Sequence, residues 1–368
     1  MTTNITTRQA GILIAIAILS MKLITFPSLY AKFSGIEGWL AIAINTAIDL
    51  VFIFLILRFM KKRPNQTFND VITETFGSIG AKILSATLAI FFTLKLLFMM
   101  SEHQNYLGET LFTYLSWPFY FVPLMGLLIY FMTRKLRGIA RCSQIVYPLV
   151  IVALIVTFAI PMQDMDFSSL LPFFDSGIGN SLNGATFCIF SAGDFFILFM
   201  LMGRVQFEGN TTRKLFNYAL FASIIVVLFY MAFFSVFRMG VVNQTDAIGD
   251  LPFFASLPST IGRIDWITIS LWTIGIVTQM GLLSNFIVQC LMFVFGSKKK
   301  ALSITIVVSA LAIEGIFMHT IMSQAVKVIV SPVFVTIIIS YQAIMFLMFI
   351  VAAARSKGGS NEFSKGAT

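Results

Sequence analysis

Long apolar stretches alternate with short polar segments along the whole chain of 368 residues. A helix needs about 20 mainly apolar residues to cross a bilayer, so a window of that length picks out candidate spans. Ten result, at 10–33, 36–58, 80–103, 118–133, 142–160, 181–203, 215–238, 264–295, 301–320 and 328–354. The pattern predicts an all-α membrane protein with ten transmembrane helices.

The polar segments between the spans are short and carry few structural signals. In "RPNQTFNDVITETFG", Thr67 followed by Asp70 is typical of a helix start, and apolar residues then recur at helical spacing. We expect a short helix on the inner membrane surface there, and a similar piece in the outer loop "DLPFFASLPSTIGRIDW". The opening "RQAGILIAIAILS" could be a signal peptide, but no small-x-small cleavage site follows, so we interpret it as the first helix.

Composition and charge fit this class and predict the orientation. The chain is 58% hydrophobic and 11% charged and contains 40 phenylalanines, which is more apolar surface than a soluble domain could bury. With the N-terminus inside, most of the 25 basic residues fall in every second loop, whereas acids gather in the others. This distribution predicts two cytoplasmic termini, and it explains the net charge of +9 without a nucleic-acid partner.

Signatures of catalysis are missing from the sequence. The two histidines, His103 and His319, lack metal-ligand spacing, and no glycine-rich phosphate loop occurs. The three cysteines, Cys142, Cys188 and Cys290, are odd in number and lie in or beside apolar segments, which favours packing roles. We expect no enzyme activity, no metal and no cofactor.

Charged residues inside the spans are the most informative feature, because such groups are costly in a bilayer and mark pathways or binding sites. They are Lys22, Asp49, Lys95, Asp194 and Glu314. At 1.5 Å per residue, Lys22 lies about 16 Å from the inner end of its span, and Asp194 lies about 20 Å from the outer end of span six. The two reach similar depths from opposite sides, which predicts an ion pair in the bilayer interior.

Both spans also carry signals for an interrupted helix. Pro27 removes a backbone donor shortly after Lys22, and "FSAGDFF" places Gly193 directly before Asp194. Spans one and six each open a group of five helices, and the two groups have opposite orientations. This favours an inverted repeat, 1–160 and 161–354, with a midplane site between broken helices, followed by a short disordered cytoplasmic tail at 355–368.

Each charged residue also has a structural explanation. Lys22 could extend toward the cytoplasmic interface, and Asp194 could cap a broken helix. Lys95 could lie close enough to the outer surface for its ammonium group to reach water, on a helix whose wet end would hold Glu102 and His103. Hydrogen bonds to polar neighbours between helices are expected for the remaining two, Asp49 and Glu314.

Several motifs resemble one family. "ITFPSLYAKFSGIEGWLA" is similar to the first-helix proline and Gly-Trp-Leu of the spore germination permeases, the B-subunits of nutrient germinant receptors. "RPNQTFNDVITETFG", "DMDFSSLLPFFDSGIG" and "FSAGDFFILFMLM" resemble that family's later segments in the same order. The resemblance implies the amino acid, polyamine and organocation transporter superfamily, with the LeuT-type five-plus-five fold and helices one and six interrupted.

The resemblance also implies a function. Such a subunit binds a small nutrient, usually an amino acid, in the spore inner membrane and triggers exit from dormancy together with a larger membrane A-subunit and a C-subunit lipoprotein. The main alternative is a proton-coupled amino-acid permease, and an ion channel is a third hypothesis.

The chain departs from the family pattern in the first helix. Ser20, Met21 and Lys22 stand where relatives usually carry a Gly-x-Gly unwinding signal, so we expect a milder break there. Lys22 could instead supply positive charge to a substrate carboxylate, or occupy the place of a cation in sodium-coupled relatives. The candidate ligand-binding residues are Ser20, Lys22, Thr25, Phe26, Ser191, Gly193, Asp194 and Thr273, and the candidate proton or charge relay is Lys22, Asp194, Asp49 and Glu102.

Overall fold

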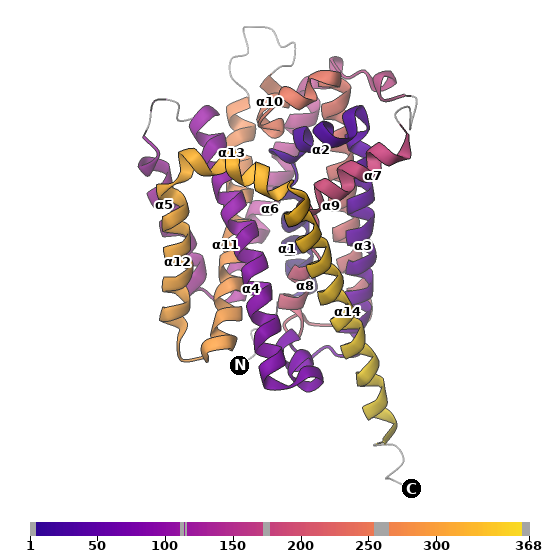
Figure 1. Ribbon diagram of the computed structural model, residues 1–368, viewed down its shortest axis with the longest axis vertical. Helices are drawn as coiled ribbons and strands as arrows, with labels where there is room; N and C mark the ends of the chain where they lie inside the picture. Colours follow the sequence, from indigo (N-terminus) through magenta and orange to yellow (C-terminus); the bar gives the residue numbers. More distant parts are fainter. Residues whose placement is uncertain (1–4, 111–113, 115, 172–176, 254–264, 363–368) are drawn as a thin grey trace.

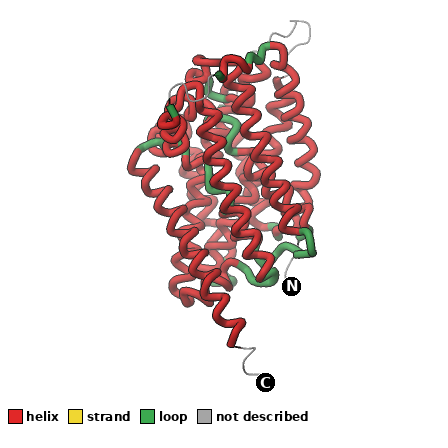
Figure 2. The backbone as a smooth tube through the Cα atoms, turned by 90° about the vertical axis from the view of Figure 1, so that its right-hand side faces the viewer, coloured by secondary structure: helices red, strands yellow, loops and turns green. Residues whose placement is uncertain are grey.

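The computed structural model describes residues 5–110, 114, 116–171, 177–253 and 265–362, and it shows a bundle of long helices. Most helices run along the long axis of the molecule, while α13 lies across one end (Figure 1). The helices and the short loops between them account for the described chain, which contains no β-strand (Figure 2). This confirms the predicted all-α class.

The helices follow the predicted order of spans. Their bounds are α1 Thr7–Ser20, α2 Phe26–Ser34, α3 Gly38–Lys62, α4 Phe68–Thr110, α5 Pro118–Thr133, α6 Leu136–Ala159, α7 Ile178–Phe187, α8 Phe196–Leu201, α9 Thr211–Phe237, α10 Ala247–Phe253, α11 Asp265–Phe295, α12 Lys300–Ile316, α13 Met318–Ile329 and α14 Pro332–Glu362. Short 3₁₀ turns connect several of them, and one of these turns, Ile189–Ser191, lies between α7 and α8.

The number of helices long enough to cross a membrane differs from the predicted ten. Within the described residues, six helices are long and apolar enough to span a bilayer, or up to seven if the bent pair α7 and α8 counts as one span. The predicted total of ten is therefore not confirmed, because α5 is a short helix of 16 residues and the predicted span 301–320 is divided between α12 and α13. The chain is nevertheless a multi-pass membrane protein, and α1 begins at the same end of the bundle at which α14 ends (Figure 1).

The predicted short helix after the second span is present. It forms the first part of α4, where Thr67 and Asp70 cap each other: the backbone N–H of Asp70 donates to Thr67 Oγ1 at 3.3 Å, and that of Thr67 donates to Asp70 Oδ2 at 2.9 Å. Gly77, with a φ of 72°, then kinks the chain before the long part of α4 begins.

Two other predicted segments differ from the structure or are only partly described. The tail expected to be disordered from residue 355 continues α14 as far as Glu362, because extending an existing helix needs no new nucleation. The final residues, 363–368, lie outside the described chain. The expected outer-loop helix corresponds in part to α10, and residues 254–264 lie outside the described chain as well.

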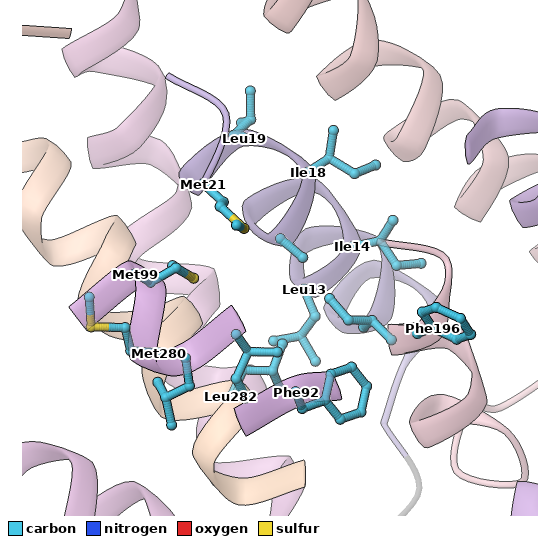
Figure 3. Close-up of a cluster of buried hydrophobic side chains, with 14 of the residues drawn as sticks. Leu13, Ile14, Ile18, Leu19, Met21, Phe92, Met99, Phe196, Met280 and Leu282 are labelled. Carbon is cyan, nitrogen blue, oxygen red and sulfur yellow. The ribbon is translucent and has the colours of Figure 1, made fainter. Parts of the chain in front are cut away.

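The centre of the bundle is α1. Its residues from Ala10 to Ser20 are all buried, and the helix is apolar on every side. It packs against α9, α6 and α11, and its side chains meet apolar groups of α4, α8 and α11 (Figure 3). An apolar surface all round is typical of a helix enclosed by others, so the neighbours of α1 form a shell around the first interrupted helix.

Close packing joins α2, the second half of the first interrupted helix, to α7, the first half of the sixth. Gly184 of α7 faces α2 and α3, and a Cβ atom at this position would lie 1.7 Å from Ser34 Oγ and 3.2 Å from Ala41 Cβ. Gly179 on the same helix has open space around its own missing Cβ. The absence of a side chain at Gly184 therefore sets how closely α7 approaches α2.

We expect Gly184→Leu to separate α7 from α2 and α3 and to lower the free energy of unfolding by about 1–3 kcal/mol, the usual cost of overpacking. The matched variant Gly179→Leu places the same side chain on the same helix in open space and should have little effect. Thermal unfolding of both purified variants in detergent measures the difference. Equal midpoints would show that the two helices are not in close contact at Gly184.

Candidate functional site

The first span is fully interrupted next to Lys22. Helix α1 ends at Ser20, residues 21–25 are not helical, and α2 begins at Phe26 with Pro27 in its first turn, where a missing N–H costs nothing. The predicted interruption of the first span is therefore confirmed, and a break milder than that of relatives remains a prediction. The chain does not need Gly-x-Gly here, because other elements supply partners for the freed backbone groups.

Three elements of the bundle hydrogen-bond to this break. In a bilayer, non-helical backbone is tolerated only where protein or water satisfies its polar groups. The contacts come from α4, α9 and α10: Thr25 N–H donates to Glu102 Oε1 at 2.8 Å, Tyr230 O–H donates to the Lys22 carbonyl at 2.9 Å, and Ala247 N–H donates to the Ile24 carbonyl at 3.0 Å. Glu102 thus acts as a cap for α2 and not as the wet end of its helix.

The sixth span is interrupted beside Asp194. Helix α7 ends at Phe187, the 3₁₀ turn Ile189–Ser191 follows, residues 192–195 are not helical, and α8 begins at Phe196. The segments on the two sides of Cys188 are bent by 58° relative to each other. Gly193 has a φ of 87°, a backbone conformation that favours glycine, and its N–H donates to Asp49 Oδ1 at 2.9 Å. The predicted interruption is therefore confirmed, and a carboxylate from the second span holds it.

The two breaks meet through the predicted ion pair. Lys22 Nζ lies 2.6 Å from Asp194 Oδ2, and the two side chains are 1% and 2% exposed. The Lys22 side chain therefore points into the protein, which excludes extension toward the cytoplasmic interface. The pairing is confirmed, whereas a role in ligand binding remains a prediction.

Two further charges complete what we call the four-charge cluster: Lys22, Asp49, Lys95 and Asp194. Lys22 Nζ is 3.4 Å from Asp49 Oδ2, and Lys95 Nζ is 3.0 Å from Asp194 Oδ1. The suggestion that Lys95 reaches water at the outer surface was wrong, because its side chain is only 3% exposed and is directed to the break in span six. Two positive and two negative groups cancel, so the cluster is electrically neutral.

The remaining predicted ligand residues lie around the breaks and differ in the contacts that they make. Ser20 donates to the Ile16 carbonyl of its own helix at 2.8 Å, which leaves its hydroxyl occupied. Phe26 is buried, and its ring centroid is 5.5 Å from that of Phe98. The Ser191 hydroxyl shares a hydrogen bond of 2.9 Å with Tyr30.

Thr273 belongs to α11, and its buried hydroxyl has no hydrogen-bond partner among the described residues. It makes no hydrogen bond to the four-charge cluster. Its assignment as a ligand residue therefore remains a prediction that no contact supports.

Several polar residues near the breaks were not identified from the sequence. Asn45 donates to Tyr30 Oη at 2.7 Å and to the Ala185 carbonyl at 2.8 Å, and Gln279 donates to the Ala17 carbonyl at 3.1 Å. The signal for Asn45 was available, since Asn45 and Asp49 are four residues apart and share one face of an apolar helix.

Contacts outside the cluster hold the two broken helices together at both ends. At the end where α1 begins, Ile5 N–H donates to the Arg204 carbonyl at 2.8 Å, and Gln206 N–H donates back to the Ile5 carbonyl at 3.0 Å. At the other end, Ser181 donates to Glu37 Oε2 at 2.9 Å. The four-charge cluster is thus enclosed from both sides of the bundle.

The ammonium and carboxylate groups of this site could exchange their present partners for those of a charged ligand. Among the described residues, no three His, Cys, Asp or Glu side chains lie together in a way that could hold a metal ion. The carboxylates instead face ammonium groups and a backbone N–H. A ligand with both an ammonium and a carboxylate could replace these partners without changing the net charge.

Known structures share this architecture. A sodium-coupled sialic acid symporter in a substrate-bound outward-open state matches with a TM-score of 0.61, 12% identity, and 95% of this chain and 79% of that chain covered. The nucleobase-cation-symport-1 family transporter MHP1, in a closed conformation with bromovinylhydantoin bound, matches with a TM-score of 0.58, 15% identity, and 90% and 78% covered. At these identities the likeness shows the fold alone, and that fold is the LeuT type.

Sequence comparison identifies the family to which the chain belongs. Spore germination protein YndE of Bacillus subtilis (strain 168) is 21% identical over 236 residues, and the match spans 62% of each chain. The family model described as spore germination protein matches residues 4–325. Since that match covers most of the sequence, the chain belongs to the spore germination protein family of membrane permeases.

Proposed function

We propose that this protein is the membrane B-subunit of a spore germinant receptor and binds a small nutrient, an amino acid, between its two interrupted helices. The observation that carries the proposal is the four-charge cluster at the junction of the two breaks. It supplies two ammonium groups for a carboxylate and two carboxylates for an ammonium group, at one buried place. It performs no covalent chemistry in this proposal.

Ligand binding exchanges the partners within the cluster. The carboxylate of an amino acid competes for Lys22 and Lys95, and its ammonium group competes for Asp49 and Asp194. Because the ligand is a zwitterion, the site remains neutral, and no uncompensated charge is left in the bilayer. Each exchanged pair weakens a contact between the breaks and the surrounding helices.

The signal follows from differential affinity for two arrangements of these helices. Tyr230 and Glu102 bind the break in span one from α9 and α4, and Lys95 binds the break in span six from α4. A ligand that favours other pairings shifts α1–α2 and α7–α8 relative to this frame. In the spore inner membrane, with both termini cytoplasmic, an A-subunit and a C-subunit lipoprotein would read that shift.

One observation favours a proton-coupled amino-acid permease as the second candidate. Glu102 is a buried carboxylate that directly holds the backbone of the break at Thr25. Its protonation would release that hydrogen bond and so couple a proton to movement of α2. The two candidates differ in whether the ligand crosses the membrane.

We expect purified protein in proteoliposomes to bind one or more members of a panel of radiolabelled amino acids saturably, without accumulating them when a proton gradient is applied. Bound and internal label are separated by a wash with excess unlabelled ligand, which displaces only accessible ligand. Accumulation that depends on the gradient would establish the permease instead. Absence of both binding and uptake across the panel would contradict the amino-acid proposal.

The cluster itself can be tested without destroying the fold. Lys22→Met alone leaves a buried carboxylate without its partner and should lower the free energy of unfolding by about 3–5 kcal/mol. The double variant Lys22→Met/Asp49→Asn removes one charge of each sign and keeps the Lys95–Asp194 pair, so most of the stability should return. Ligand binding should remain lost in the double variant, because half of the exchangeable charges are gone.

Thermal unfolding and radiolabelled amino-acid binding are measured on the same preparations. The control is Lys32→Met, which removes an exposed lysine from α2 and should change neither quantity. Normal amino-acid binding by the stable double variant would remove the cluster from the ligand site.

A further inference from the structure

An apolar cavity lies apart from the four-charge cluster. Its volume is about 570 Å³, it is open on one side, and it is lined by α4, α12, α13 and α14 together with the 3₁₀ turn at the break in span six. Most of its wall is aliphatic or aromatic, and its polar lining residues are Ser101, Glu314 and Gln324. Cavities of this size and character suit small organic ligands.

One carboxylate oxygen in this cavity is unpaired. Glu314 is only 5% exposed, and its Oε1 accepts a hydrogen bond of 2.5 Å from the Ser101 hydroxyl. Its Oε2 is buried and has no hydrogen-bond partner among the described residues. A buried acceptor without a donor is costly, so this oxygen points to a ligand that brings an N–H group.

The charge of the lining restricts what that ligand can be. Among the described residues that line the cavity, none is Lys or Arg. The carboxylate of a zwitterionic amino acid would therefore have no positively charged partner in this cavity. The phosphate of a phospholipid headgroup would have none either. A single positive charge on an otherwise apolar molecule fits both the carboxylate and the walls.

We propose that this cavity is a binding site for a small apolar organic amine in its protonated form. The ammonium group donates to Glu314 Oε2, and the hydrocarbon part packs against the aromatic rings of Phe98, Phe190 and Phe334. Aromatic faces also attract a cation, which adds to the selectivity for an amine over an uncharged molecule. The site is separate from the proposed nutrient site in both position and ligand charge.

The cavity walls reach both helix breaks. Phe190 belongs to the turn Ile189–Ser191 inside span six, and its ring centroid is 5.8 Å from that of Phe98. The Phe98 ring in turn contacts Phe26, the first residue of α2. An amine in the cavity would thus press on rings that pack against both interruptions, which makes it a regulator of the arrangement of the broken helices.

The test uses the full chain in nanodiscs and equilibrium dialysis with radiolabelled 2-phenylethylamine, with empty nanodiscs as the background. The uncharged counterpart, 2-phenylethanol, has nearly the same shape. We expect saturable binding of the amine and at least about tenfold weaker binding of the alcohol, as for loss of a charge-assisted hydrogen bond. Glu314→Gln should weaken amine binding by a similar factor and leave alcohol binding unchanged.

Three further variants keep the result interpretable. Ala310→Phe places a ring in the cavity one helical turn from Glu314 and should abolish binding of the amine, whereas Ser303→Ala, on the same helix but outside the cavity, should not change it. Lys22→Met/Asp49→Asn should retain amine binding, so failure of the proposed nutrient site and failure of this site are distinguishable. Amine binding no stronger than that of the alcohol, or unchanged by both Glu314→Gln and Ala310→Phe, would overturn the proposal.

Discussion

The structure depends on placing four charged side chains in a bilayer so that none is left alone. Asp194 lies between two lysines, Lys22 lies between two aspartates, and every one of these groups is nearly inaccessible to water. Removing a single partner would leave a buried charge whose cost is a large part of the stability of a typical domain. The breaks in spans one and six must therefore lie side by side, and α3 and α4 must present Asp49 and Lys95 at the same depth.

The same polar side chains that balance charge also keep the helices open. Asp49 both contacts Lys22 and accepts the N–H of Gly193, so it serves the cluster and the break in span six together. Glu102 and Tyr230 perform the second task for span one. Because the freed backbone groups already have partners within the protein, the interruptions are stable features of the fold and need no ligand to form.

Sequence reasoning located the breaks and the Lys22–Asp194 pair because their signals are local: a proline, a glycine before an acid, and depth counted from a span's end. The same reasoning could not place Lys95 at the correct depth. Its helix, α4, has a kink near its start and runs for 43 residues, so a depth counted from an assumed end of the span is misleading. Hydropathy also extended the ninth span from α12 into the first residues of α13 and did not identify α13 as a separate helix, although the polar residues in "MHTIMSQAVKVI" are typical of an interfacial helix. Which helix face meets which neighbour is a property of packing, and no pattern within one span contains it.

Helix α4 is the element through which the separate parts of the molecule can influence one another. Lys95, Phe98 and Glu102 follow the spacing of one helix face, and they contact the break in span six, the start of α2 and the break in span one. The adjacent face carries Leu94, Leu97 and Ser101 into the apolar cavity. A small rotation of α4 would alter the charge cluster, the cap of α2 and the cavity together. A change at the four-charge cluster, at the cap of α2 or in the apolar cavity could therefore affect the other two through α4 alone. No chain of intermediate contacts is required, since this one helix touches all three.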